Sequence, residues 1–228
     1  MEKMSAEKLR KKIYKNRNGG RCLDLRGKGL SKVPEAVFDL TELEELDLSD
    51  NYLKELPTSI NKLKNLKTLR LFGNQLRELP NSICELSNLT ELSVRRNQLS
   101  VLPSTIKHLK NLGELNLSSN QLTTLPDEIG ELKELGWLFV NNNKLTVLPS
   151  HIKHLSKLRG LYLSNNQLTT LPDEIDELKW LGWLHVAGNP LTLEEMRKVV
   201  NLQNKMKFRT DVKGKNMKCS LFVFHFVL

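Results

Sequence analysis

LEELDLSDNYLKELPTSINKLKN, residues 43–65, is one full copy of a unit that returns along this chain every 23 residues. Its Leu56-Pro57 pair recurs at that step from Val33-Pro34 to Leu171-Pro172. An asparagine keeps the same step at Asn51, Asn74, Asn97, Asn120, Asn143, Asn166 and Asn189. Self-similarity at a fixed period of this length predicts a repeat architecture, in which each unit packs only against its neighbours.

The unit predicts its own local structure. The alternating leucines at Leu46 and Leu48 mark a short strand with one buried face. Pro57 lacks an N–H group, so the segment that returns from the strand is not itself a strand. Ile60 and Leu63 then face the core from the other side, on a helical or 3-10 turn. One unit cannot bury these side chains alone, whereas stacked units can.

The asparagine of each unit stands where the chain turns away from the strand. A side-chain amide carries both donors and an acceptor, so it can bond the backbone groups that a turn leaves unpaired. Repetition at a fixed step predicts a structural ladder made of all seven asparagines.

Composition limits the class of protein. The chain has 228 residues, of which 39% are hydrophobic and 27% charged, as in an ordinary soluble protein. No stretch is apolar enough for a transmembrane helix or a signal peptide. Cys22, Cys84 and Cys219 are odd in number and form no CxxC pair, so we expect neither a disulfide framework nor a zinc site. These features favour a cytoplasmic protein.

The net charge of +9 lies in the ends of the chain. Residues 1–19 carry +5, residues 207–228 carry +4, and the residues between them sum to zero. A protein that reads nucleic acid more often has a basic face on its folded domain. The distribution therefore argues against nucleic acid as the partner.

The motif L-x-x-L-x-L-x-x-N-x-L-x-x-L-P-x-x-I-x-x-L resembles the leucine-rich repeat (LRR) family over residues 20–191. It is most similar to the 23-residue intracellular type, which includes the Ras-scaffold LRR proteins, the Scribble/Erbin group and the plant intracellular Ras-group proteins. The resemblance implies a right-handed α/β solenoid of about eight repeats. Its parallel sheet would line the concave face, with short helices or 3-10 turns on the convex face and helical caps at the ends. It also implies a non-enzymatic module for protein interaction or a signalling scaffold.

Both ends of the array predict caps. Residues 1–19 form a basic N-terminal cap, with a helix from Ser5 to Lys15. At the other end Thr192 and Glu195 match a capping box that opens a C-terminal capping helix, residues 192–206. Three of its apolar residues are expected to pack on the last repeat: Met196, Val199 and Val200.

Residues 207–228 form a basic and hydrophobic tail. It suits a membrane-surface anchor with Cys219 as an acylation site, and equally an extra strand or a packed cap.

Counting along each unit predicts which side chains leave the concave face. The repeats that start at residues 66 and 89 expose Arg70, Phe72, Arg95 and Arg96. The last copies expose Trp137, Phe139, Tyr162, Trp183 and His185, with Gly160 leaving a slot between the two tryptophans. Exposed aromatic and arginine side chains are typical of protein-binding hot spots, which favours a partner site here. The alternative is that the rings only pack along the sheet and stiffen it.

An internal duplication supports the binding interpretation. Residues 101–144 and 147–190 align with an offset of 46, and 13 of the 44 pairs differ. Seven of these differences lie at strand-side positions, which is expected if that face reads ligands.

Catalytic signatures are missing from the sequence. It holds no GxxxxGK[ST] loop and no HExxH, and His151 and His154 are expected to be solvated surface residues. We therefore predict a monomeric, non-enzymatic protein without a cofactor or metal that binds a protein or peptide. Two alternatives remain: an innate-immune LRR protein that binds a microbial glycan or lipid, and a protein that binds membrane surfaces or nucleic acid through its basic tails.

Overall fold

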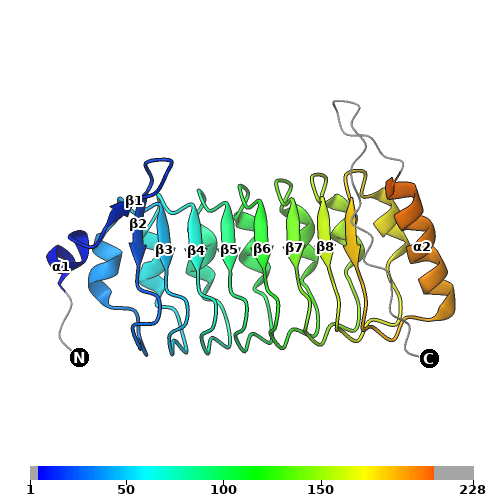
Figure 1. Ribbon diagram of the computed structural model, residues 1–228, viewed down its shortest axis with the longest axis horizontal. Coiled ribbons are helices and arrows are strands. Elements are labelled where there is room, and N and C mark those ends of the chain that lie inside the picture. Colours follow the sequence, from blue (N-terminus) through cyan, green and yellow to red (C-terminus); the bar gives the residue numbers. More distant parts are fainter. Residues whose placement is uncertain (1–4, 208–228) are drawn as a thin grey trace.

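The computed structural model describes residues 5–207 as one curved solenoid (Figure 1). Its strands form a nine-stranded sheet in chain order, in which β2 to β9 are parallel and β1 is antiparallel to β2. This confirms the predicted fold. The strands are β1 (Tyr14–Lys15), β2 (Arg21–Asp24), β3 (Glu45–Asp47), β4 (Thr68–Arg70), β5 (Glu91–Ser93), β6 (Glu114–Asn116), β7 (Trp137–Phe139), β8 (Gly160–Tyr162) and β9 (Trp183–His185).

The segments that return from the strands are 3-10 turns, and an α-helix lies at each end. The turns are η1 (Glu35–Asp39), η2 (Thr58–Lys62), η3 (Asn81–Glu85), η4 (Ser104–His108), η5 (Asp127–Glu131), η6 (Ser150–His154) and η7 (Asp173–Glu177); the helices are α1 (Ala6–Arg10) and α2 (Leu193–Lys207). Each 3-10 turn directly follows the proline of its repeat. In the second of them Ile60 N donates to Pro57 O at 3.1 Å, so the proline serves as an acceptor where it has no N–H to give.

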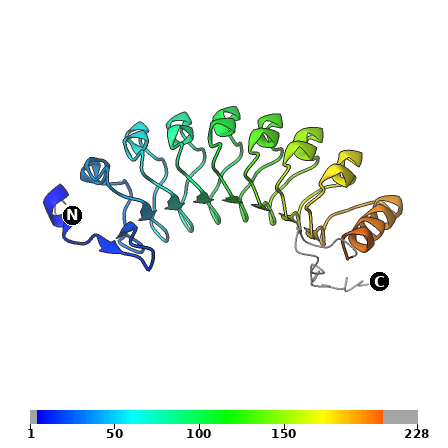
Figure 2. The ribbon, with the colours of Figure 1, turned by 90° about the horizontal axis from the view of Figure 1, so that it is seen from above.

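The sheet lines the inside of the arch and the 3-10 turns line the outside (Figure 2). Adjacent strands are held about 4.8 Å apart by their hydrogen bonds, whereas the turns with their side chains are wider. The array therefore bends toward the strands. The register advances by one repeat from strand to strand, as in Leu46 beside Leu69, so the leucines stack into one continuous core in which Leu46, Ile60 and Leu63 are fully buried.

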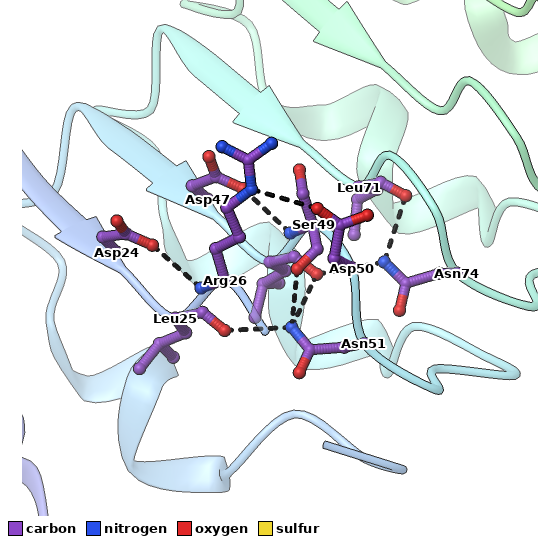
Figure 3. A network of polar contacts seen from close by, with 10 residues as sticks. Asp24, Leu25, Arg26, Asp47, Ser49, Asp50, Asn51, Leu71 and Asn74 are labelled. Carbon is purple, nitrogen blue, oxygen red and sulfur yellow. Dashed lines mark hydrogen bonds and ion pairs between the residues drawn. The ribbon is translucent and has the colours of Figure 1, made fainter. Parts of the chain in front are cut away.

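The predicted asparagine ladder is confirmed in all seven repeats. In the first rung, Asn51 Nδ2 donates to Leu25 O (Figure 3) and to Leu48 O, both at 2.9 Å. Asn51 Oδ1 accepts from Leu30 N at 2.9 Å. The same three bonds recur at every step of 23 residues up to Asn189. Each amide thus joins its own turn to the preceding repeat.

The residue before each of these asparagines has a left-handed backbone. The positions are Asp50, Gly73, Arg96, Ser119, Asn142, Asn165 and Gly188, with φ between 52° and 73°. A side chain in this region costs roughly 1 kcal/mol relative to glycine. The spacing of the repeat predicted only that these positions point out of the concave face. The structure adds a backbone constraint that favours Gly, Asn and Asp there.

The N-terminal cap differs from the prediction. The helix expected from Ser5 to Lys15 ends at Arg10, and Tyr14–Lys15 form β1 against β2. The helix gives way to a hairpin because Asn16 Oδ1 accepts from Asn18 N and Gly20 N, and Gly19 adopts φ +81°. The added strand covers the hydrogen-bonding edge that the first repeat would leave open.

The C-terminal cap also differs in detail. Thr192 Oγ1 accepts from Glu195 N at 3.2 Å as predicted, but the Glu195 carboxylate accepts from Leu171 N at 3.1 Å instead of returning to Thr192. Glu195 is buried at 6% exposure and so ties α2 to the last full repeat. Val199 is buried as predicted. Val200, which was also expected to pack on the last repeat, is 47% exposed, and Leu202 is buried instead. Met196 is partly buried against the core.

The predictions for the tail, including Cys219, lie outside the described residues except that Lys207 ends α2. Within residues 5–207 no helix has the length and apolar character needed to span a bilayer.

Replacing Asn120 by Ala should lower the free energy of unfolding by about 2–3 kcal/mol, because Leu99 N, Val94 O and Leu117 O would lose a buried partner. Urea denaturation measures the change. The control is Asn111→Ala, since Asn111 makes one exposed bond to Ser87 O and should cost less than about 1 kcal/mol. Equal effects of the two substitutions would contradict the structural role of the ladder.

Candidate partner-binding site

The structure brings the five predicted C-terminal residues together on three adjacent strands. We name them the aromatic cluster. They are Trp137 and Phe139 on β7, Tyr162 on β8, and Trp183 and His185 on β9. They sit at alternate positions, so their side chains leave the concave face, and each is half-buried.

The rings of the cluster form a continuous stack. Phe139, Tyr162 and His185 lie in one row, with centroids 4.5 Å and 4.6 Å apart and interplanar angles of 21° and 11°. Trp137 and Trp183 form a second pair at 5.1 Å. Such pairs contribute roughly 0.5–1.5 kcal/mol each beyond the area they bury. The rings therefore do stiffen the sheet, while their outer faces stay accessible.

The predicted slot at Gly160 is absent. A Cβ atom on Gly160 would lie 2.4 Å from Trp137 Cε3, so the indole of Trp137 already fills the space above the glycine. The prediction was wrong because it placed each side chain over its own strand. Trp137 instead leans across β8 toward Trp183.

The cluster carries little charge at neutral pH. Burial raises the pKa of Tyr162 and lowers the pKa of His185, which favours the neutral form of each. The surface offered to a partner is therefore largely apolar.

The other predicted group, made of Arg70, Phe72, Arg95 and Arg96, forms two separate sets of contacts. Arg95 and Arg96 flank the ring of Phe72, with their guanidinium carbons 5.6 Å and 5.3 Å from its centroid, in a cation–π arrangement. Both arginines are exposed.

Arg70 does not belong with them. It pairs with Glu45, and its Nη2 lies 3.6 Å from Glu91 Oε2. Burial alone would raise the pKa of Glu45, but the hydrogen bond and charge of Arg70 lower it overall. The sequence did not reveal this because the partners come from β3 and β5, on either side of β4.

A groove beside the aromatic cluster was missed from the sequence. Its volume is about 610 Å³. The residues that line it include Glu91, Gly113, Glu114, Gly136, Trp137 and Arg159. Trp180, 39% exposed, also lines the groove. The signal was present in the repeat, since the residue before the first leucine reads Asn65, Asn88, Asn111 and then Glu134, Lys157, Trp180.

The convex histidines are surface residues, as predicted. His151 Nδ1 lies 3.2 Å from Asp127 Oδ1, and the rings of His151 and His154 meet edge to face at 5.5 Å. Over the part of the chain that the structure describes, no three metal-ligating side chains come together.

A family model described as leucine rich repeat matches residues 21–76, 87–145 and 133–191, which is more than half of the chain. The chain belongs to the leucine-rich repeat family. No enzyme family was found, and this fold generally serves as a non-catalytic module that binds proteins or peptides.

Solved structures of the same fold come from bacteria and plants. An internalin, inlF of Listeria monocytogenes, matches with 24% identity and a TM-score of 0.72, over 80% of this chain and 52% of that one. The plant peptide hormone receptor RGFR1, solved in complex with RGF2, matches with 34% identity and a TM-score of 0.67, over 78% of this chain and 33% of that one. PEPR1 in its structure with AtPEP1 matches with 29% identity and a TM-score of 0.67, over 78% of this chain and 26% of that one.

This chain thus spans about half, or less, of the length of the structures it matches. No curated protein matches it significantly.

Replacing Gly160 by Ala should displace the Trp137 ring and uncouple it from Trp183, because the new methyl group would occupy the ring's position. We expect a weaker near-ultraviolet circular dichroism signal and a red-shifted tryptophan emission. Gly113→Ala is the control, since its Cβ would have Thr90 O as nearest neighbour at 3.6 Å. An unchanged signal in the Gly160 variant would show that the ring lies elsewhere.

Replacing Glu114 by Gln should stabilise the fold at neutral pH. Burial, then the nearby Glu91 charge, raises the pKa of Glu114, so its stabilising contribution is complete below the unfolded pKa and is lost as pH rises through the folded pKa. The glutamine does not titrate. The unfolding temperature of the variant, relative to that of the wild type, should therefore rise between about pH 4 and pH 7.5.

Glu45→Gln provides the control of opposite sign. Because the folded pKa of Glu45 is lowered, its contribution is present above the unfolded pKa and is lost in acid. This variant should be less stable than the wild type at pH 7.5 and approach it only as the pH falls below about 4, through the lowered folded pKa of Glu45. Parallel behaviour of the two variants would contradict the assigned electrostatics.

Proposed function

We propose that this protein is a non-enzymatic interaction module of the intracellular LRR type that binds an extended peptide or protein segment on its concave face, as a signalling scaffold. The observation that carries the proposal is the aromatic cluster on β7 to β9. Five ring-bearing side chains gather there without charge, on a face that is otherwise polar. Large apolar groups in such a setting are informative about binding.

The mechanism is binding by a preorganised surface. The ring stack, the buried leucine core and the asparagine ladder hold the cluster in one geometry before a partner arrives. Little side-chain entropy is then lost on association, which leaves more of the interaction free energy as affinity. The plant receptor structures of similar fold, one of them described as a peptide hormone receptor, support a peptide as the partner.

A cytoplasmic location is part of the proposal. Cys22 and Cys84 are buried and free among the described residues, which is compatible with a reducing compartment.

Recognition of a microbial glycan or lipid is the second candidate. Its support is the internal duplication, whose strand-side positions differ more often than the rest. A glycan could use the same rings by stacking, so the two functions share a site and differ in ligand.

Selection of random displayed peptides on the full chain tests the first function. We expect the wild type to enrich a peptide motif, and the Tyr162→Ala, Trp183→Ala double variant to bind the enriched peptides at least tenfold more weakly, because two contact rings are lost. Tyr52→Ala is the control, since Tyr52 is 60% exposed but stands outside the cluster. Fluorescence anisotropy measures the affinities.

Each other outcome assigns a different function. Bacterial cell-wall glycans retained by the wild type and lost in the double variant would favour the second candidate. Binding that survives in the double variant, falls with salt and disappears on deletion of residues 1–19 and 207–228 would favour the basic tails.

A further inference from the structure

We propose that the groove beside Trp137 is a subsite for one cationic side chain, arginine or lysine, of the bound peptide, with the carboxylate of Glu114 as its counter-ion. The inference rests on the proposed function, because it names the chemistry of a residue in that peptide. It is carried by three features of the groove: an open floor, an unpaired carboxylate and an aromatic wall.

The floor of the groove is open because two adjacent repeats have glycine at the same position. Gly113 and Gly136 stand just before β6 and β7, and neither has a positive φ. A Cβ atom on either would have 3.6 Å to its nearest neighbour, an ordinary contact. The fold therefore does not require glycine at these positions, unlike Gly160, and their effect is to keep space above the backbone.

The carboxylate of Glu114 has no counter-ion within residues 5–207. Arg70, whose charge acts on Glu114, is already paired with Glu45 and Glu91. The side chain of Glu114 makes no hydrogen bond or ion pair in the described part of the chain, although the residue is half-buried. A half-buried carboxylate beside a second carboxylate, Glu91, is stabilised by an incoming cation, which supplies the missing charge and hydrogen bonds.

Trp137 supplies the wall. Its ring leans over Gly160 toward Trp183, on the far side of β7 from Glu114, so the carboxylate is not covered. An alkyl chain or guanidinium lying against the indole while its charge meets Glu114 gains both packing and cation–π attraction.

The opposite side of the groove limits the ligand to a single cation. Lys157 is neutralised by Glu134 at 2.6 Å, but the exposed guanidinium of Arg159 has no ion pair among the described residues. A run of basic residues would therefore meet Arg159 and be repelled. This distinguishes the subsite from a general acidic surface.

The internal duplication provides a matched variant. Gly113 corresponds to Arg159 in the second copy, so Gly113→Arg introduces a residue that the same backbone position already accepts. The new side chain would fill the groove and neutralise Glu114. It should block the subsite and leave the core leucines in place.

The test uses NMR of the full chain, following the tryptophan indole N–H signals at low ionic strength. The probe is N-acetyl-arginine methylamide, and the control probe is its uncharged analogue N-acetyl-citrulline methylamide. We expect the arginine probe to shift the Trp137 signal saturably and further than that of Trp183, which does not line the groove. Citrulline should bind about fivefold or more weakly, since it lacks the charge.

Two variants complete the test. Glu114→Gln should weaken the arginine probe by about fivefold or more, and Gly113→Arg should abolish the saturable shift. Equal binding of both probes, undiminished binding to Glu114→Gln, or no saturable shift in the wild type would overturn the subsite.

The outcome separates this inference from the proposed function. If no displayed peptide is enriched but the arginine probe binds beside Trp137, the peptide function fails and the cation site stands. If peptides are enriched through Tyr162 and Trp183 without a fixed arginine or lysine, and the probe fails, the function stands and the cation site is wrong.

Discussion

The hydrogen bonds from one buried asparagine per repeat are the interaction on which the rest of the array depends. Strands of three residues leave most of each repeat in turns, whose backbone groups need partners once they are buried. Asn51 and its six equivalents satisfy three such groups each, and two of the three belong to the preceding repeat. The ladder therefore couples neighbouring repeats as well as closing turns. The left-handed residue before each asparagine is the geometric consequence, because the chain must leave the strand sharply to bring the amide inside.

The features that repeat could be predicted from the sequence, and the features that do not repeat could not. The period placed the strands, the 3-10 turns, the core and the ladder, since each recurs in every unit. Each cap occurs once and depends on its own local bonds. Asn16 closes a hairpin where a longer helix was expected, and the Glu195 carboxylate accepts from Leu171 N instead of returning to Thr192. The positions of each repeat whose side chains leave the concave face were predicted correctly. The lean of Trp137 over Gly160 and the pairing of Arg70 depend on neighbouring strands, which spacing along one strand does not reveal.

The concave face has two halves of different character. From β2 to β5 its charges are largely satisfied within the protein, as in Arg70 with Glu45 and Arg26 with Asp50. Such exposed pairs contribute little to stability, but they leave little unmet charge for a partner. From β7 to β9 the side chains of the aromatic cluster carry no charge, and Arg159 just before β8 is an exposed cation beside them. Glu114 on β6 lies at the boundary between the two halves. The charge of Arg70 acts on it, but Arg70 is already paired with Glu45, so the Glu114 carboxylate is left without a partner in the described chain.

The duplicated repeats show that folding and recognition are separable in this molecule. The two copies keep the same leucines and the same ladder asparagines but exchange Gly113 for Arg159 and Glu114 for Gly160. At Gly188 a larger residue would clash, since its Cβ atom would lie 2.1 Å from Asn165 Oδ1. At Gly113 no such contact exists, and the copy accepts arginine in its place. The residues that shape the groove are therefore free of the demands of the solenoid, and a change in the charge the groove presents would leave the ladder and the core intact.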